Sequence, residues 1–334
     1  MILSAIVDDY VRSAEPVGSR SISKRGGVGY SPATIRNEMS DLEELGYLEQ
    51  PHTSAGRIPS HKGYRYYVDN LLQTGELTQE EIAQLRNVLT DRLLEIEKVI
   101  QQAAIILSNL TNYTAIVLGP EVHNTSLRHL QLLPLSDNRA VAIIVTNTGH
   151  VEKKVVEIPE GLPVSEIERT VSILNAKLKG VPIVQLKAKL STEIASELRK
   201  HVSRYEELIA SIETALRGSE DGRVFFGGAS NMLAQPEFRD VEKVKSILGV
   251  LEQTDTWIKL FANVREGIQV SIGTENSLKA ISDCSLVTAT YSLHGRTIGT
   301  IGVLGPTRME YGKVIGLLER FSKDLSDALD KWYG

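Results

Sequence analysis

The segment 31–60 constrains the fold of this chain more than any other. Ser31 is a favourable N-cap residue, and Pro32 suits the first position of a helix. Apolar side chains then recur at helical spacing and predict one buried stripe, formed by Ile35, Met39, Leu42 and Leu45. Gly46 suits the left-handed conformation that ends many helices. The segment therefore predicts a helix that begins after Ser31 and stops at Gly46.

A β-hairpin follows this helix in the sequence. Residues 47–50 (YLEQ) predict a short strand, 51–57 a loop and 58–60 (IPS) a returning strand. A helix followed by such a wing is typical of a recognition helix, whose first turns meet base edges in the major groove of DNA. Upstream, apolar residues predict a helix that Pro16 ends and a second helix over 17–24. The whole segment thus predicts a winged helix-turn-helix, which can serve DNA binding or pure protein interaction.

The distribution of charge favours DNA binding. The net charge of the chain is −5, but 17–37 and 50–68 contain basic residues and no acid. Such local basic stretches suit contact with phosphates. The predicted DNA-binding residues are Ser19, Arg20, Lys24, Ser31, Thr34, Arg36, Asn37, Thr53, Arg57 and Lys62.

Three of these residues have more specific predicted roles. Arg36 and Asn37 suit bidentate contacts to guanine and adenine. Arg57 is expected at the wing tip, where it would contact a phosphate or the minor groove. The alternative for Arg36 is an intramolecular pair with Glu43 or Glu44 that merely stabilises the helix.

Beyond a linker around Gly75, the pattern predicts an α+β fold. A T-x-x-E capping box at Thr78 and Glu81 begins a helix that runs to about residue 110, with apolar residues every seven positions. This helix is either a connector rod or a helix lying on the core of its own domain. Strands are predicted within 113–158, a helical interlude at about 162–222, and a last helix at about 311–331. Two strand pairs are predicted between these helices, 257–265 with 268–275 and 284–293 with 296–306.

Other functional classes find little support in the sequence. The single cysteine, Cys284, excludes an internal disulfide and fits a reducing cytoplasm. No long apolar run or signal peptide appears, so a soluble, cytosolic protein without membrane contact is expected. Seven scattered histidines predict no metal site, and the glycines at 299, 302 and 305 favour close packing over nucleotide binding. No catalytic motif or cofactor site is predicted.

Segments along the whole chain resemble one known family. The run SPATIRNEMSDLEELGYLEQPHTSAGRIPSHKGYRYYVDNL (31–71) resembles the signature of the heat-inducible transcription repressor family, HrcA. So do EPVGSRSISKR, FFGGASNML and GxIGVLGPTRMEY, at 15–25, 225–233 and 299–311. One departure lies at the start, because the family's first helix begins several residues before the position of Met1. The packing of that helix is therefore where we expect a difference.

The resemblance implies a domain organisation and a function. It implies a winged helix-turn-helix (1–72) and a GAF-like α+β domain (73–161 and 223–334), interrupted by a largely helical dimerisation domain (162–222). It also implies a homodimeric repressor of chaperone operons that binds double-stranded DNA at an inverted-repeat operator, and that the GroEL chaperonin keeps active. Two alternatives remain: a small-molecule-responsive repressor with a pocket in the GAF-like domain, and an enzyme with a DNA-binding appendage. A ligand that shifts operator affinity would favour the first, and a convergent charged cleft the second.

Overall fold

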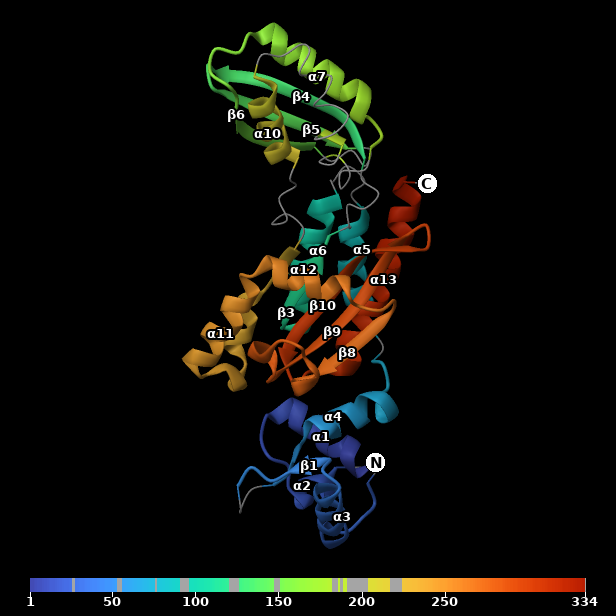
Figure 1. The fold of residues 1–334 in the computed structure, drawn as a ribbon. Coiled ribbons are helices and arrows are strands. Elements are labelled where there is room, and N and C mark those ends of the chain that lie inside the picture. The colour runs from blue at the N-terminus through green and yellow to red at the C-terminus, as the bar shows by residue number, and fades with distance from the viewer. Residues whose placement is uncertain are drawn as a thin grey trace. The chain divides into compact units, whose positions relative to one another are not determined.

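The computed structural model divides the chain into two compact units (Figure 1). Unit 1 comprises Met1–Gly119 and Asp221–Gly334, and unit 2 comprises Pro120–Glu220. The structure describes residues 1–25, 28–52, 56–75, 77–90, 96–119, 126–146, 151–181, 186, 189–190, 204–216 and 224–333.

Unit 1 begins with three helices and a hairpin, in the order that the sequence predicts. We call residues 1–71 the N-terminal subdomain. Its elements are α1 (Ile2–Ser13), α2 (Ser19–Lys24), α3 (Pro32–Glu44), β1 (Leu48–Glu49), β2 (Ile58–Pro59), α4 (His61–Tyr66) and the π-helical turn η1 (Tyr67–Leu71). The strands β1 and β2 pair antiparallel. The first helix, α1, buries the side chains of Ile2, Leu3 and Ile6. Met1 occupies its N-cap position, where its side chain makes no capping hydrogen bond.

Helix α3 begins and ends as its sequence predicts. The Ser31 hydroxyl accepts a hydrogen bond from the Thr34 backbone N–H, 3.2 Å away. Gly46 has a φ of +79°, and the N–H of Tyr47 reaches back to the Leu42 carbonyl at 2.8 Å. This is the Schellman arrangement of a helix end. The prediction that Leu45 is buried is wrong: its side chain is 59% exposed, because it caps the helix and the turn at Gly46 packs Tyr47 inward instead.

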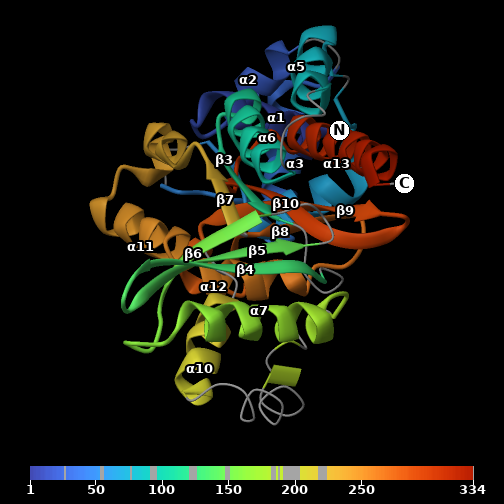
Figure 2. The ribbon, with the colours of Figure 1, turned by 90° about the horizontal axis from the view of Figure 1, so that it is seen from above.

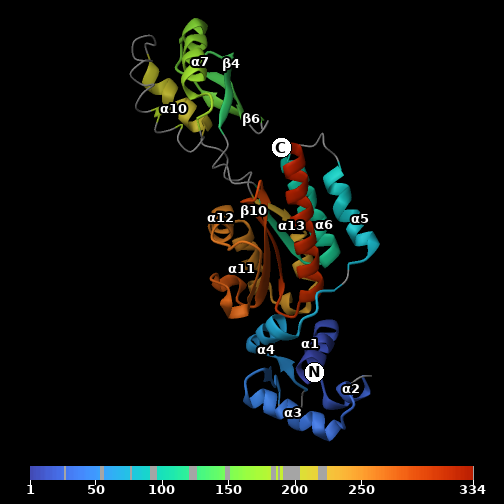
Figure 3. The ribbon, with the colours of Figure 1, turned by 90° about the vertical axis from the view of Figure 1, so that its right-hand side faces the viewer.

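The rest of unit 1 is a sheet covered by helices on both faces (Figure 3). The five-stranded sheet has the order β7-β3-β10-β9-β8, and every pairing is antiparallel. Its strands are β3 (Thr114–Leu118), β7 (Val224–Gly227), β8 (Ile268–Ile272), β9 (Cys284–Leu293) and β10 (Arg296–Pro306). The helices α6 (Ile96–Thr111) and α13 (Tyr311–Tyr333) cover one face, and α5 (Gln79–Thr90) packs against both of them. The helices α11 (Val241–Leu251) and α12 (Thr254–Ala262) cover the other face.

Two predictions for this core need correction. The single helix expected to run to about residue 110 is wrong, because α5 and α6 are separate helices. Leu85 and Ile100 are both fully buried in one apolar cluster of unit 1, which favours the alternative of helices lying on the core of their own domain. Residues 91–95 between them lie outside the described part. The segment 257–265, predicted as a strand, belongs largely to α12. Trp257 and Phe261, four residues apart, are buried on one helical face with their rings 5.8 Å apart.

The glycines of β10 pack closely, as predicted. An added Cβ at Gly302 would lie 2.7 Å from the ring of Phe261, and one at Gly305 would lie 2.8 Å from the ring of Tyr113. The two rings belong to opposite faces of the sheet. Because these glycines have no side chain, the aromatic rings can pack directly on the backbone of β10.

Unit 2 has a separate three-stranded sheet and its own core (Figure 2). The strands are β4 (Leu127–Ser136), β5 (Arg139–Thr146) and β6 (Val151–Glu157), and the helices are α7 (Val164–Leu178) and α10 (Tyr205–Leu216). The Asn175 side chain of α7 makes hydrogen bonds of 2.8 and 2.7 Å to the backbone N–H and carbonyl of Leu130 in β4. The predicted boundary at 161/162 thus differs from the observed division, because these strands pack with α7.

Candidate nucleic-acid interface

The exposed face of α3 presents the residues predicted to contact DNA. Thr34, Arg36 and Asn37 are exposed, whereas Ile35 and Met39 are buried on the opposite face. The hydroxyls of Ser31 and Thr34 lie 2.9 Å apart and hydrogen-bond to each other at the helix start.

Arg36 and Asn37 are exposed polar side chains on this face. Among the described residues, neither has an ion pair or side-chain hydrogen bond. The alternative pair of Arg36 with Glu43 or Glu44 is therefore absent from that part of the chain. Both side chains are exposed in the N-terminal half of α3, where they are accessible to a duplex.

Helix α2 contributes further positive charge. Arg20 and Lys24 are exposed, and Ser19, the first residue of α2, is half-buried. Arg25 has a structural role instead, because its guanidinium pairs with Asp8 at 3.3 Å and Asp9 at 2.9 Å. The basic stretch 17–37 thus leaves Arg20, Lys24 and Arg36 for solvent.

Arg57 lies in a different environment from the one that the sequence predicts. Its guanidinium Nη2 lies 2.7 Å from a carboxylate oxygen of Glu43 in α3, and its Nε donates to the same oxygen at 2.8 Å. Its backbone exchanges two hydrogen bonds of 2.9 Å with Val17. An added Cβ on the neighbouring Gly56 would overlap the Val17 carbonyl, which explains the glycine there. Arg57 is thus held at the base of the wing and not free at its tip.

Lys62 is also engaged within the protein. Its ammonium donates to the Leu45 carbonyl at 2.8 Å and lies 4.6 Å from the centre of the Tyr47 ring. It thereby satisfies a carbonyl at the end of α3, where the helix itself leaves carbonyls without partners. Thr53 lies outside the described residues.

One candidate contact is missing from the sequence-based set. The side chain of Tyr30 is 50% exposed, and it directly precedes the N-cap Ser31. Its backbone carbonyl accepts a hydrogen bond from the Ser23 hydroxyl at 3.2 Å. The signal in the sequence is its position, because an aromatic residue directly precedes the predicted recognition helix.

Other kinds of site find little support in the described part of the chain. No cluster of three or more potential metal ligands occurs there, and none of its helices is both long and apolar enough to cross a membrane. A surface groove of about 610 Å³ lies along α5 and α13, lined by charges of both signs. Two of these, Arg320 and Asp324, are paired at 2.8 Å. A pair within one helix differs from the convergent charged groups of an enzyme cleft.

Comparisons with known proteins agree along nearly the whole chain. Residues 97–315 match the family model described as the HrcA protein C-terminal domain. The heat-inducible transcription repressor HrcA of Brevibacillus brevis is 54% identical over 329 residues, which cover 98% of this chain and 96% of that protein. The same repressor of Halalkalibacterium halodurans is 51% identical over 333 residues, covering 100% and 97%.

A solved structure has the same fold. The crystal structure of a hypothetical protein at 2.2 Å resolution aligns with a TM-score of 0.69 and 24% identity, over 99% of this chain and 97% of that one. The family model and these relatives show that the chain belongs to the HrcA family of heat-inducible transcription repressors.

Proposed function

We propose that this protein represses chaperone operons by binding an inverted-repeat operator as a homodimer. The observation that carries the proposal is the exposed pair Arg36 and Asn37 in the first turns of α3, free of partners among the described residues. Such side chains discriminate guanine and adenine by two hydrogen bonds each. The relatives are named heat-inducible transcription repressors, which supports heat-shock genes as the targets and a regulatory role for this chain.

The homodimer follows from the symmetry of the proposed site. One α3 helix reads one half-site, and an inverted repeat presents two halves related by a two-fold axis. We assign dimerisation to unit 2, the insertion between two parts of unit 1. Its sheet exposes apolar side chains, including Leu135 at 61% and Val155 at 64%. Large exposed apolar side chains on a sheet favour association.

GroEL is proposed to control the amount of active repressor. Direct redox sensing suits the chain poorly, because Cys284 is buried and burial raises the pKa of its thiol to about 12. A chaperonin that assists folding would instead raise the folded fraction and leave the affinity of each folded dimer unchanged. When heat supplies GroEL with other clients, this fraction falls and the operons open.

A gel-shift titration tests operator recognition. Arg36→Ala and Asn37→Ala should each weaken binding to the inverted repeat by about 1–3 kcal/mol and relax preference at one base pair per half-site. Arg239→Ala, an exposed arginine before α11, is the matched control and should leave binding unchanged. A lower melting temperature of Arg36→Ala with intact base preference would show that the base-reading role is wrong.

A second titration tests the role of GroEL. Heat-treated repressor is incubated with or without GroEL and ATP. Saturation with excess operator then gives the active fraction, and a separate titration of operator around Kd gives the affinity. The active fraction should rise with GroEL while Kd stays constant. A constant active fraction with a changed Kd would contradict the proposal.

A further inference from the structure

The turn between β10 and α13 carries an arginine that contacts the N-terminal subdomain. Arg308 has only 11% of its side chain exposed. Its Nη1 donates to the Val11 carbonyl of α1 at 3.0 Å, and its guanidinium also pairs with the carboxylate of Glu237. A third bond of 3.1 Å goes to the side-chain oxygen of Gln235. Arg308 thus joins α1 to two separate segments of the core.

A second arginine makes the reverse contact, from the subdomain to the core. Arg65 of α4 pairs with Glu275 through two nitrogens, one of them Nε at 2.9 Å, and also donates to the Val270 carbonyl of β8 at 2.6 Å. Glu275 is itself held by the backbone N–H of Ile272 at 2.9 Å. Although partial burial opposes it, these hydrogen bonds lower the pKa of the Glu275 carboxyl. Glu275 therefore stays charged and fixed near neutral pH.

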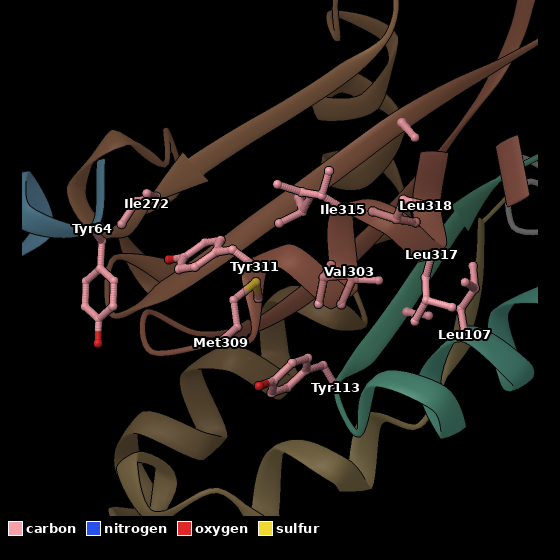
Figure 4. Close-up of a cluster of buried hydrophobic side chains, with 14 of the residues drawn as sticks. Tyr64, Leu107, Tyr113, Ile272, Val303, Met309, Tyr311, Ile315, Leu317 and Leu318 are labelled. Atoms are coloured by element: carbon pink, nitrogen blue, oxygen red, sulfur yellow. The ribbon is translucent and has the colours of Figure 1, made fainter. Parts of the chain in front are cut away.

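Apolar packing at the same junction brings the two parts close together. The rings of Tyr64 in α4 and Tyr311 in α13 lie 6.0 Å apart (Figure 4). Tyr311 is held by hydrogen bonds of 2.6 Å with Ser285 and 2.7 Å to the Thr307 carbonyl. The ring of His61 lies so close to Gly273 that a Cβ there would overlap it. The aromatic packing opposes separation of the N-terminal subdomain from the core of unit 1, whereas the directional arginine contacts oppose its rotation on that core.

We propose that Arg308 and Arg65 are positioning residues for operator recognition, which fix the orientation of the N-terminal subdomain on the core. In a dimer this orientation contributes to the separation of the two α3 helices, and hence to the half-site spacing that both can bind at once. Neither arginine belongs to the exposed face of α3. The inference rests on the proposed operator binding, and it extends that proposal to two residues outside α3.

The spacing preference of the operator tests this role. Arg308→Met and Arg65→Met keep the apolar stems of both side chains and remove the directional contacts. Arg320→Met is the matched control, because the ion pair of Arg320 with Asp324 lies within α13. Each protein is titrated against the native inverted repeat, repeats with the spacer changed by one or two base pairs, and a single half-site.

The two junction variants should lose about tenfold in affinity for the native repeat, since binding at the second half-site loses effective concentration. Their affinity for altered spacers should change by less than about threefold, and that for a single half-site should stay unchanged. Wild type and Arg320→Met should keep a strong preference for the native spacing. An unchanged spacing preference, or an equal loss on all DNAs including the half-site, would overturn the inference.

A measurement without DNA separates this inference from the proposed function. Spin labels at Ser40→Cys in α3 and Glu252→Cys after α11 occupy exposed positions, and Cys284 is buried. Both labels are in the same chain, and the labelled protein is diluted with unlabelled protein so that distances between protomers do not contribute. The distance distribution should be narrow in the otherwise wild-type protein and should broaden only in Arg308→Met and Arg65→Met. If wild type shows no preference for an inverted repeat, the proposed function fails, while this distribution still tests the junction. A distribution that stays narrow in both variants would overturn the positioning role.

Discussion

Arg57 and Glu43 form an ion pair, with the guanidinium Nη2 2.7 Å from the carboxylate Oε2. The pair joins the residue before β2 to the last turn of α3. Both side chains are partly exposed, at 21% and 33%. Glu43 therefore holds the base of the wing against the recognition helix, and its charge also opposes any phosphate that approaches Arg57.

Glu43→Gln should release Arg57 for DNA. We expect stronger binding to all sequences alike and a salt slope steeper by about one unit per protomer. The variant should also lose about 0.5–1 kcal/mol of stability, as is typical of a partly exposed pair. Glu44→Gln, an exposed neighbour, removes the same charge and is the control. Equal effects of both variants in a salt-dependent gel-shift series would show that the net charge matters and the pair does not.

Local signals in the sequence were sufficient for the ends of α3 and the start of α5. Ser31 and Gly46 define the ends of α3 through bonds to residues within a few positions. The capping box of Thr78 and Glu81 forms as predicted, with the Glu81 carboxylate 2.9 Å from the Thr78 backbone nitrogen. Caps of this kind depend on neighbours in the chain and are therefore readable without a structure.

Tertiary contacts account for what the sequence left open. The partner of Arg57 lies fourteen residues away, so its ion pair depends on how the hairpin folds back on α3. Arg308 and Val11 are separated by 297 residues, and no spacing rule relates them. Short apolar runs such as 257–265 fit a strand or a helix equally, and here burial of Trp257 and Phe261 on one face decided for the helix.

The glycines of β10 should resist enlargement. Gly302→Ala and Gly305→Ala place a Cβ against the rings of Phe261 and Tyr113, which should cost about 1–3 kcal/mol of stability through overpacking. Gly249→Ala in α11 meets nothing within 4 Å and should instead stabilise its helix by up to about 1 kcal/mol. Urea denaturation compares the three variants. Equal effects at the three positions would show that helix or strand propensity, and not packing, governs them.

The Glu81 capping box should make stability depend on pH in acid. The hydrogen bond from the Thr78 backbone lowers the pKa of the Glu81 carboxyl, and Lys313, 3.2 Å away, lowers it further. The stabilising contribution is thus present above the unfolded pKa of about 4.3 and is lost as the pH falls through the lower folded value. The stability difference between wild type and Glu81→Gln should be constant from about pH 6 to 8 and shrink below about pH 4.5. Glu80→Gln, exposed in the same turn, is the control. A difference that grows on acidification would contradict this assignment.

The hydroxyls of Tyr64 and Tyr311 should affect stability in opposite directions. Tyr64 is buried, and its Oη has no hydrogen-bond partner among the described residues. A buried polar atom without a partner costs about 1–3 kcal/mol, so Tyr64→Phe should leave the free energy of unfolding unchanged or raise it. Tyr311→Phe loses the hydrogen bonds with Ser285 and Thr307 and should lower it by about 1–3 kcal/mol.

The two variants control for each other, because both remove one oxygen and keep an aromatic ring at the same junction. Urea denaturation at pH 7 gives the free energy of unfolding of each variant, and gel shifts with Tyr64→Phe should match wild type. A destabilisation of Tyr64→Phe as large as that of Tyr311→Phe would show that the Tyr64 hydroxyl has a partner in solution, such as a buried water. In that case the junction between α4 and α13 would contain a polar contact in addition to the aromatic packing.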